Sequence, residues 1–350
     1  MGAPRIMDVL SDVLKAVTLE GAVFYNAEFS APWGFRAPAS RQVGPLFSPS
    51  GGHVIMFHLL TEGRGFARLD DGEPMSLEAG DIVVFPHGDP HVVENGGWRP
   101  SGKKGAVPRS SGRNRNVLRV LSQGLKLARG GGGGEVTKFV CGYIACEPRL
   151  SRFMLAGLPP VFKVHIRDDD AGRWLESSIR FSVDAAARSG PGGEAVLAKL
   201  SEALFIETLR RYVAQWPEGR TGWLAGARDP EIGRALALMH RRPAHPWSLA
   251  DLAREAGLSR SVLAERFRHF LRQPPMAYLT RWRLQLGARI LSSSSRSVAD
   301  VAAEVGYESE AAFNRAFKRA FSVPPARFRT RSRSAADSGA EAPPQRRRRR

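Results

Sequence analysis

The segment from Gly80 to Asn95, GDIVVFPHGDPHVVEN, holds the side chains of this sequence that are most suggestive of metal chemistry. His87 and His91 lie four residues apart, and a Pro-x-Gly corner begins at Pro86. Neutral imidazole nitrogens are common ligands of zinc and iron. The segment is typical of one half of a metal site in a small β-barrel enzyme, so it raises the question of whether this protein is an enzyme.

The rest of the sequence shows no other catalytic pattern. No Ser-His-Asp order, phosphate-binding loop or dinucleotide-binding glycine pattern occurs elsewhere. The two cysteines, Cys141 and Cys146, lie in a stretch typical of a strand, where an odd separation places them on opposite faces about 16 Å apart, too far for a disulfide. They are interpreted as buried thiols in a reducing cytoplasm or, as the lesser alternative, as a redox sensor.

Length, composition and charge favour a two-domain globular protein with a polyanionic partner. The 350 residues are 43% hydrophobic, which is enough for two separate cores. No apolar run approaches the roughly 18 residues that span a bilayer, and the start lacks a signal-peptide pattern, so we expect a soluble cytoplasmic protein with no membrane partner. The net charge of +18 is uneven, because residues 1–98 are acidic overall and residues 228–330 are basic. A basic C-terminal domain suggests nucleic acid.

Periodicity divides the chain into a β-rich part and a helical part. Short apolar runs separated by turns such as Asp71-Gly72 predict a β domain over residues 8–190. Within it, residues 99–134 are basic and end in a glycine run, which predicts a flexible insertion. Residues 191–223 have helical spacing and form a helical linker, with two alternatives open: a helix packed on the β domain, or a dimerisation helix. Residues 331–350 end in five arginines and predict a disordered basic tail.

An internal repeat follows in the basic half. Residues 249–275, LADLAREAGLSRSVLAERFRHFLRQPP, match residues 298–325, VADVAAEVGYESEAAFNRAFKRAFSVPP. Ser248 and Ser297 precede the two copies, each with an aspartate three positions later, which is the pattern of a capped helix start. Each copy therefore begins with a short helix.

A glycine turn and a second helix complete each copy. Gly257 and Gly306 end the short helices at positions where a left-handed residue lets the chain turn sharply. The second helices are expected over about 259–270 and 309–321, and a helix over 276–291 joins the copies. Short helix, turn and second helix form the helix-turn-helix unit. Two copies about 50 residues apart are a much stronger signal than one.

The segment from about 229 to 329 resembles the DNA-binding domain of AraC/XylS-type transcription regulators. The stretches AYLTRWRLQLGARIL, DVAAEVGYES and FNRAFKRAF and the Pro-Pro pairs carry the resemblance. It implies a domain over 229–330 that places two helix-turn-helix units in successive major-groove segments of double-stranded DNA. It also implies RNA polymerase as a partner if the protein is an activator.

The resemblance implies a set of DNA-contacting residues on the two recognition helices. Arg315 is suited to grip guanine and Asn314 to read adenine, whereas basic side chains at the edges are suited to clamp phosphates. By position, the base-facing residues are Ser261, Ala264, Glu265, Glu310, Ala311, Asn314 and Arg315, and the phosphate clamps are Arg260, Arg268, Lys318 and Arg319.

Three positions depart from the family pattern. The usual glycine after each recognition helix is Arg272 in the first copy and Ser322 in the second, so we expect these helices to end without the left-handed glycine cap. Glu265 stands where a base-reading or basic side chain is common, and it could accept from cytosine or repel phosphate.

The N-terminal part resembles a cupin. Gly80, Pro86, Gly88, His91 and Asn95 fit the second cupin motif, G-x5-P-x-G-x2-H-x3-N. The β domain, with FHLLTEGRG, FVCGYIACE and LPPVFKVH, is similar to the cupin sensor domain found ahead of AraC-type regulators. The fold class expected is therefore α+β: a cupin-like β-barrel followed by an all-α double helix-turn-helix domain.

The cupin resemblance also names a candidate effector pocket. In metal cupins the first motif supplies two histidines and a glutamate, but here only His58 and Glu62 fit, because Met56 replaces the other histidine. With His91 this leaves three ligands of a four-ligand pattern. We expect neither a cofactor nor a metal, and we interpret His58, Glu62 and His91 as contacts for a small-molecule effector.

Three functional hypotheses remain. The leading one is a sequence-specific transcription regulator that is not an enzyme, that responds to a small molecule through its cupin domain and that pairs two DNA sites as a homodimer. The second is a metal-dependent cupin enzyme fused to a DNA-binding domain. The third is an architectural DNA binder that needs no ligand.

Overall fold

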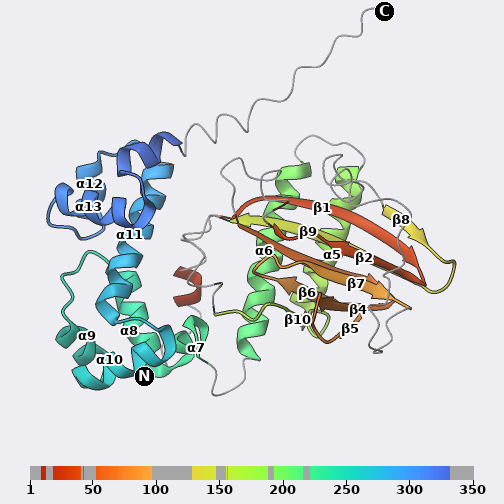
Figure 1. Ribbon diagram of the computed structural model, residues 1–350, viewed down its shortest axis with the longest axis horizontal. Helices are drawn as coiled ribbons and strands as arrows, with labels where there is room; N and C mark the ends of the chain where they lie inside the picture. Colours follow the sequence, from red (N-terminus) through yellow and green to blue (C-terminus); the bar gives the residue numbers. More distant parts are fainter. Residues whose placement is uncertain are drawn as a thin grey trace, which may run out of the picture. The chain divides into compact units, whose positions relative to one another are not determined.

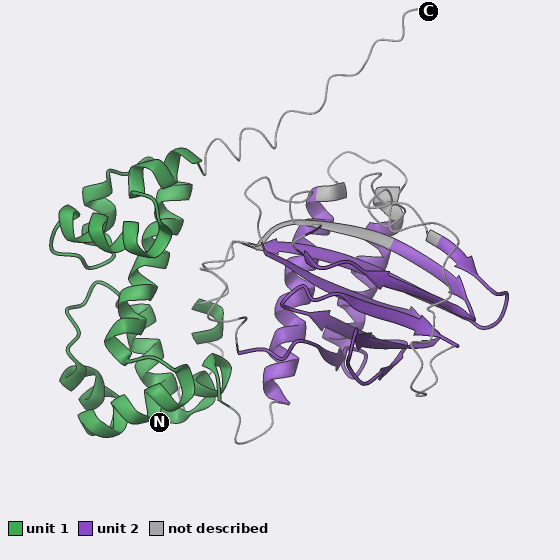
Figure 2. Ribbon diagram, viewed as in Figure 1, with its two compact units in different colours: residues 1–17, 219–350 green, residues 18–218 purple. Residues whose placement is uncertain are grey.

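A computed structural model describes residues 9–12, 19–40, 42, 53–96, 128–146, 155, 157–187, 193–215 and 221–331. The chain forms two compact units (Figure 2). Residues 18–218 form the sheet unit, and residues 1–17 with 219–350 form the helical unit. Strands thus belong to the first unit and the repeat to the second, which confirms the α+β class. Within the described ranges, no helix combines the length and apolar character needed to cross a bilayer.

The sheet unit contains two sheets (Figure 1). The first has the strand order β10-β6-β3-β9-β1-β8, and the second has the order β2-β7-β4-β5. The first comprises β1 (Leu19–Ser30), β3 (His53–Glu62), β6 (Asp81–Phe85), β8 (Ala128–Gly131), β9 (Val136–Cys146) and β10 (Phe162–His165). The second comprises β2 (Trp33–Ala37), β4 (Arg64–Leu69), β5 (Met75–Glu78) and β7 (His91–Asn95).

The core of this unit lies between the two sheets. Alternate residues of β3 and β9 face inward, among them Val54, Met56, Phe139 and Tyr143, together with Trp33 from β2. Among the described strands, no ladder of hydrogen bonds joins one sheet to the other. The expected barrel is therefore two open sheets packed face to face.

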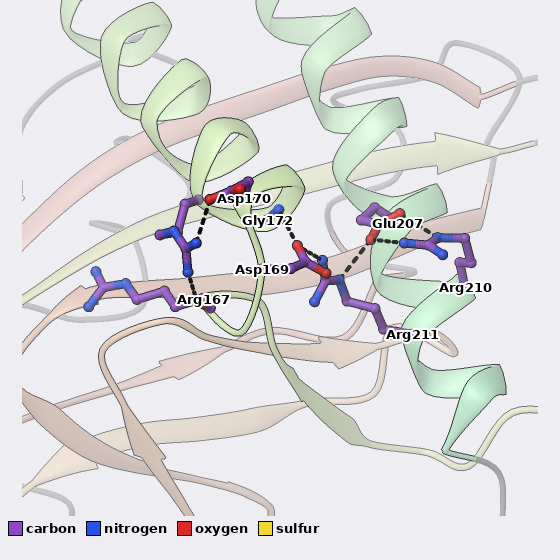
Figure 3. A network of polar contacts seen from close by, with 8 residues as sticks. Arg167, Asp169, Asp170, Gly172, Glu207, Arg210 and Arg211 are labelled. Carbon is purple, nitrogen blue, oxygen red and sulfur yellow. Dashed lines mark hydrogen bonds and ion pairs between the residues drawn. The ribbon is translucent and has the colours of Figure 1, made fainter.

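Two helices, α5 (Asp170–Ala187) and α6 (Gly193–Ala214), accompany the first sheet (Figure 1). Figure 3 shows how they are joined: Arg211 of α6 donates to Asp169 at the start of α5 (2.6 Å) and to Glu207 (2.7 Å). The Gly172 N–H, and then Arg211, hold the pKa of Asp169 below its usual value. Helix α6 packs on α5, β1 and β10, and the dimerisation helix considered for residues 191–223 stays a prediction.

The structure differs in part from the flexible insertion expected over residues 99–134. Residues 128–131 form β8, which runs parallel to β1 with Ala128 opposite Ala27. The Gly132 N–H donates to Ser30 O (2.9 Å), so the glycine run is held against β1. Residues 97–127 and the tail beyond residue 331 lie outside the described residues.

The helical unit consists of short helices joined by tight turns. α11 connects the two copies of the repeat, and a last helical segment covers 325–331. The helices are α7 (Trp223–Arg228), α8 (Pro230–Arg241), α9 (Leu249–Ala256), α10 (Arg260–Leu271), α11 (Pro275–Ser293), α12 (Val298–Glu304) and α13 (Glu310–Phe321).

Candidate nucleic-acid interface and histidine core

Both helix-turn-helix units begin at the predicted caps. The Ser248 hydroxyl accepts from Asp251 N (3.1 Å), and the Asp251 carboxylate accepts in return from Ser248 N, which completes a capping box. In the second copy, Ser297 accepts from Asp300 N (3.0 Å). The predicted starts of α9 and α12 are confirmed.

The turns within the two units depend on glycine. Gly257 has φ 79° and Gly306 has φ 87°, a left-handed region that side chains disfavour. A Cβ on Gly306 would lie 2.6 Å from Ala244 Cα, whereas one on Gly257 would meet only Arg234 Nη1 at 3.7 Å. At the second turn, a side chain is therefore excluded by packing as well as by backbone conformation.

The recognition helices α10 and α13 each bury one face and expose the other. Leu263 and Phe267 are fully buried in α10, as are Phe313 and Phe317 in α13. The residues predicted to contact DNA all lie on the opposite, solvent-facing side of their helices. Ala264 and Asn314 are half-buried, and Arg260, Ser261, Glu265, Arg268, Glu310, Ala311, Arg315, Lys318 and Arg319 are exposed.

The exposed cations of these helices keep their charges available. Within residues 221–331, no ion pair engages Arg260, Arg268, Arg315, Lys318 or Arg319. Asn314 Nδ2 donates to Glu310 Oε1 (3.3 Å), which orients the amide and leaves its oxygen free to accept. The second recognition helix thus presents an oriented amide beside a free guanidinium, and the first presents no amide among the predicted residues.

The ends of both recognition helices differ from the expectation. Arg272 (φ 55°) and Ser322 (φ 64°) adopt the left-handed conformation although neither is glycine. Their amides donate to Arg268 O (2.9 Å) and Lys318 O (2.8 Å). The cap geometry is therefore kept, at the steric cost that a side chain carries in this region.

A buried hydrogen-bond chain crosses the core of the sheet unit. His58 of β3 and His91 of β7 come from opposite sheets, and their Nε2 atoms lie 2.8 Å apart. His91 Nδ1 lies 2.9 Å from Asp89 O, and His58 Nδ1 lies 2.9 Å from Cys141 Sγ. Phe85 stacks on His91 with ring centroids 3.5 Å apart.

The carbonyl at the end of this chain fixes the direction of every bond. Asp89 O can only accept, so His91 Nδ1 donates and Nε2 of the neutral His91 ring accepts from His58 Nε2. His58 Nδ1 then accepts from the Cys141 thiol. Burial lowers the pKa of His91 to about 4, and burial followed by repulsion from His91 lowers the pKa of His58 well below its usual value. Both imidazoles are neutral near pH 7.

Glu62 does not join the two histidines. Strand alternation alone would place it on the same face as His58, but the pairing of β3 with β9 shifts register between Leu60 and Glu62. This bulge turns Glu62 outward, where it pairs with Lys138 at 2.6 Å. The expected set of His58, Glu62 and His91 is therefore corrected to the two histidines with Cys141.

His58 and His91 supply only two ligands of the cupin metal pattern, and their Nε2 atoms lie at hydrogen-bond distance from each other, 2.8 Å. The third cupin ligand, Glu62, points away. A second group of possible metal ligands, Glu78, Asp81 and His165, lies close together in the sheet unit. There, Lys163 already pairs with Asp81 at 3.0 Å.

Comparisons with known proteins agree with this two-part arrangement. The sequence profile described as Cupin matches residues 8–214, and the one described as Helix-turn-helix domain matches residues 252–331. A putative AraC-like transcription regulator of Streptomyces antibioticus is 31% identical over 92% of this chain and 98% of its own length. The chain belongs to the AraC-like transcription regulators.

Other relatives of this AraC-like regulator are similar over nearly their whole length. The HTH-type transcriptional regulator AlkR of Acinetobacter baylyi is 27% identical over 93% of this chain and 100% of its own. Among solved structures, the DNA-binding domain of AdpA in complex with a target DNA is 27% identical and covers 32% of this chain and 99% of that chain, with a TM-score of 0.30.

Two helices of this AraC-like regulator are not predicted by the sequence pattern. α5 exposes Trp174 and Phe181, so its apolar residues do not form the single stripe by which a helix is found. α7 has six residues, WLAGAR, too few to show a period. The sequence feature that indicates α7 is the Asp229-Pro230 cap of the next helix, because a preceding element must end there.

Proposed function

We propose that the helical unit reads specific DNA sequences with α10 and α13, and that the protein acts as a transcription regulator and not as an enzyme. The observation that carries this proposal is the position of the predicted contact residues on the solvent faces of two capped recognition helices, where all of them are exposed except the half-buried Ala264 and Asn314. Arg315 supplies bidentate contact with guanine, Asn314 reads adenine, and the remaining cations contact phosphates.

Fluorescence anisotropy with promoter DNA from the protein's own locus tests this function. We expect nanomolar binding that weakens steeply between 50 and 200 mM salt, because released counterions drive phosphate contact. Random DNA of equal length should bind at least about a thousandfold more weakly at the same salt. Equal affinity for both DNAs would reject sequence-specific reading.

We further propose that the sheet unit senses a small molecule at the core around His58 and His91. Two neutral imidazoles buried among Phe35 and Phe85 can exchange the hydrogen bond between them for bonds to a polar ligand. Ligand entry would separate the two sheets locally and so favour a second conformation. The test is a metabolite panel scored by thermal shift and DNA affinity, with His91→Gln as the variant that should lose the response.

Remaining partners follow from this role. A homodimer would pair two DNA sites, and RNA polymerase would be contacted if the protein activates transcription. We expect both interactions to take place in the cytoplasm. Sedimentation of the full chain with and without a specific DNA site tests the homodimer. A complex that contains one chain per DNA molecule would mean that the protein binds its site as a monomer.

A further inference from the structure

The connection from the sheet unit enters the helical unit at α7, which is seated on the first recognition helix. The Gly222 N–H donates to Phe270 O in the last turn of α10 (2.9 Å). Gly226 lies so close to α10 that an added Cβ would be 2.8 Å from Leu271 Cδ1 and 3.1 Å from Phe270 Cβ. The first helix of the unit therefore contacts the C-terminal end of α10 directly.

An ion pair ties the middle of α10 to the other end of α7. Arg266 Nη2 pairs with the Asp229 carboxylate and lies 3.1 Å from Glu231 Oε2. Asp229 caps both neighbouring helices, since it is the C-cap of α7 and accepts from Ile232 N (3.0 Å) as the N-cap of α8. Its side chain is only 12% exposed, and a charge-assisted pair at such a site is stronger than a surface pair.

A second set of bonds holds α7 from its other side. Trp223 Nε1 donates to Tyr278 Oη of α11 (2.9 Å), and that hydroxyl also bonds His240 Nε2 of α8 (2.7 Å). Burial lowers the pKa of His240 to about 3, so its ring is neutral near pH 7. Helix α7 is thus held on one side by α10 and on the other by α11.

The second helix-turn-helix unit has no such anchor. The repeat places Ala316 of α13 where α10 has Arg266. Among the described residues, no ion pair links α13 to another helix. Only the first recognition helix is thus tied to the segment that arrives from the sheet unit.

We propose that Arg266 is a positioning residue for DNA reading: by pairing with Asp229 at the junction of α7 and α8, it sets the orientation in which α10 meets DNA. The inference rests on the proposed reading of DNA by both helices. Arg266 itself faces Asp229 and Glu231 and makes no base contact in this role.

The test compares base discrimination at the two parts of the site in the full-length protein. Substituting base pairs one at a time in a bound DNA, and repeating this with Arg315→Ala, identifies the part read by α13. The measured quantity is the ratio of Kd for substituted and unsubstituted DNA, which does not depend on the fraction of folded protein. Arg254→Ala, which removes an exposed cation from the same unit, is the matched control.

Arg266→Ala should lower discrimination at the α10 part by about three- to tenfold and leave the α13 part within about twofold. Arg266→Lys, which keeps the cation, should retain most of it, and Arg254→Ala should leave both ratios unchanged. Equal losses at both parts, no loss at either, or equal effects of Lys and Ala would overturn the inference. A wild-type protein without base preference at any position would instead reject the proposed function.

Discussion

The Nε2 atoms of His58 and His91 lie 2.8 Å apart, and the hydrogen bond between them joins the two sheets of the sheet unit. Each ring makes a second bond, to Cys141 and to Asp89 O, so the whole chain is satisfied only while both imidazoles are neutral. The stability of this unit is therefore linked to pH.

Acid should destabilise the sheet unit well before carboxylates are protonated. The pKa of His91 is about 4 in the folded state and about 6.5 when unfolded, so the unfolded chain binds more protons between these values. The contribution of neutral His91 to the free energy of unfolding is complete above roughly pH 6.5. It falls by on the order of 3 kcal/mol as the pH approaches 4. Urea unfolding at pH 7.5 and 5.0, with His87→Gln as the control, measures this. Equal midpoints for wild type at the two pH values would contradict the assigned neutral pair.

Replacing the side chains at the left-handed helix ends by glycine should stabilise the helical unit. Arg272→Gly and Ser322→Gly remove a steric cost that exceeds the extra backbone entropy of glycine, so each should raise the free energy of unfolding by about 0.5–1 kcal/mol. Ala320→Gly, inside α13, should lower it by about 1 kcal/mol. Thermal unfolding checks the sign, and a lower melting temperature for both cap variants would refute the cap assignment.

The two turn glycines should respond differently to alanine. Gly257→Ala makes only an ordinary contact with Arg234 Nη1 at 3.7 Å, so it should cost about 1–2 kcal/mol from backbone conformation. Gly306→Ala adds a clash with the backbone of Ala244 and should cost several kcal/mol or prevent folding of α12 and α13. Denaturant unfolding of the two variants side by side measures the difference. Equal costs would mean that the loop at Ala244 yields easily.

Arg315 and Lys318 should separate base reading from phosphate contact. Arg315→Ala should relax preference at one base pair and cost about 1–3 kcal/mol on the specific site only. Lys318→Ala should weaken specific and random DNA alike and reduce the slope of log K against log salt by about one. Salt titrations of both variants on both DNAs check this, and a uniform loss for Arg315→Ala would remove it from the base-reading set.

Local signals made the helical unit predictable from sequence. Serine caps at Ser248 and Ser297 and the turns at Gly257 and Gly306 each fix a helix boundary within a few residues, and all four are found in place. The left-handed Arg272 was not predictable, because propensity disfavours it and tertiary packing overrides propensity.

The histidine core depended on information that spacing does not contain. His58 meets Cys141 because β3 pairs with β9 across 83 residues of sequence, and a bulge after Leu60 removes Glu62 from the same face. Register and bulges are set by packing of distant strands. The motif therefore identified His58 and His91 but not their neighbours.

Selection of bound DNA from a random library tests the central claim most directly. Two recognition helices joined by α11 should enrich two short sequence elements about one helical turn apart, roughly 10 base pairs. Arg315→Ala should erase one position of one element, and the other element should persist. Recovery of DNA with no enriched sequence, or of a single element unaffected by substitutions on α13, would contradict the account.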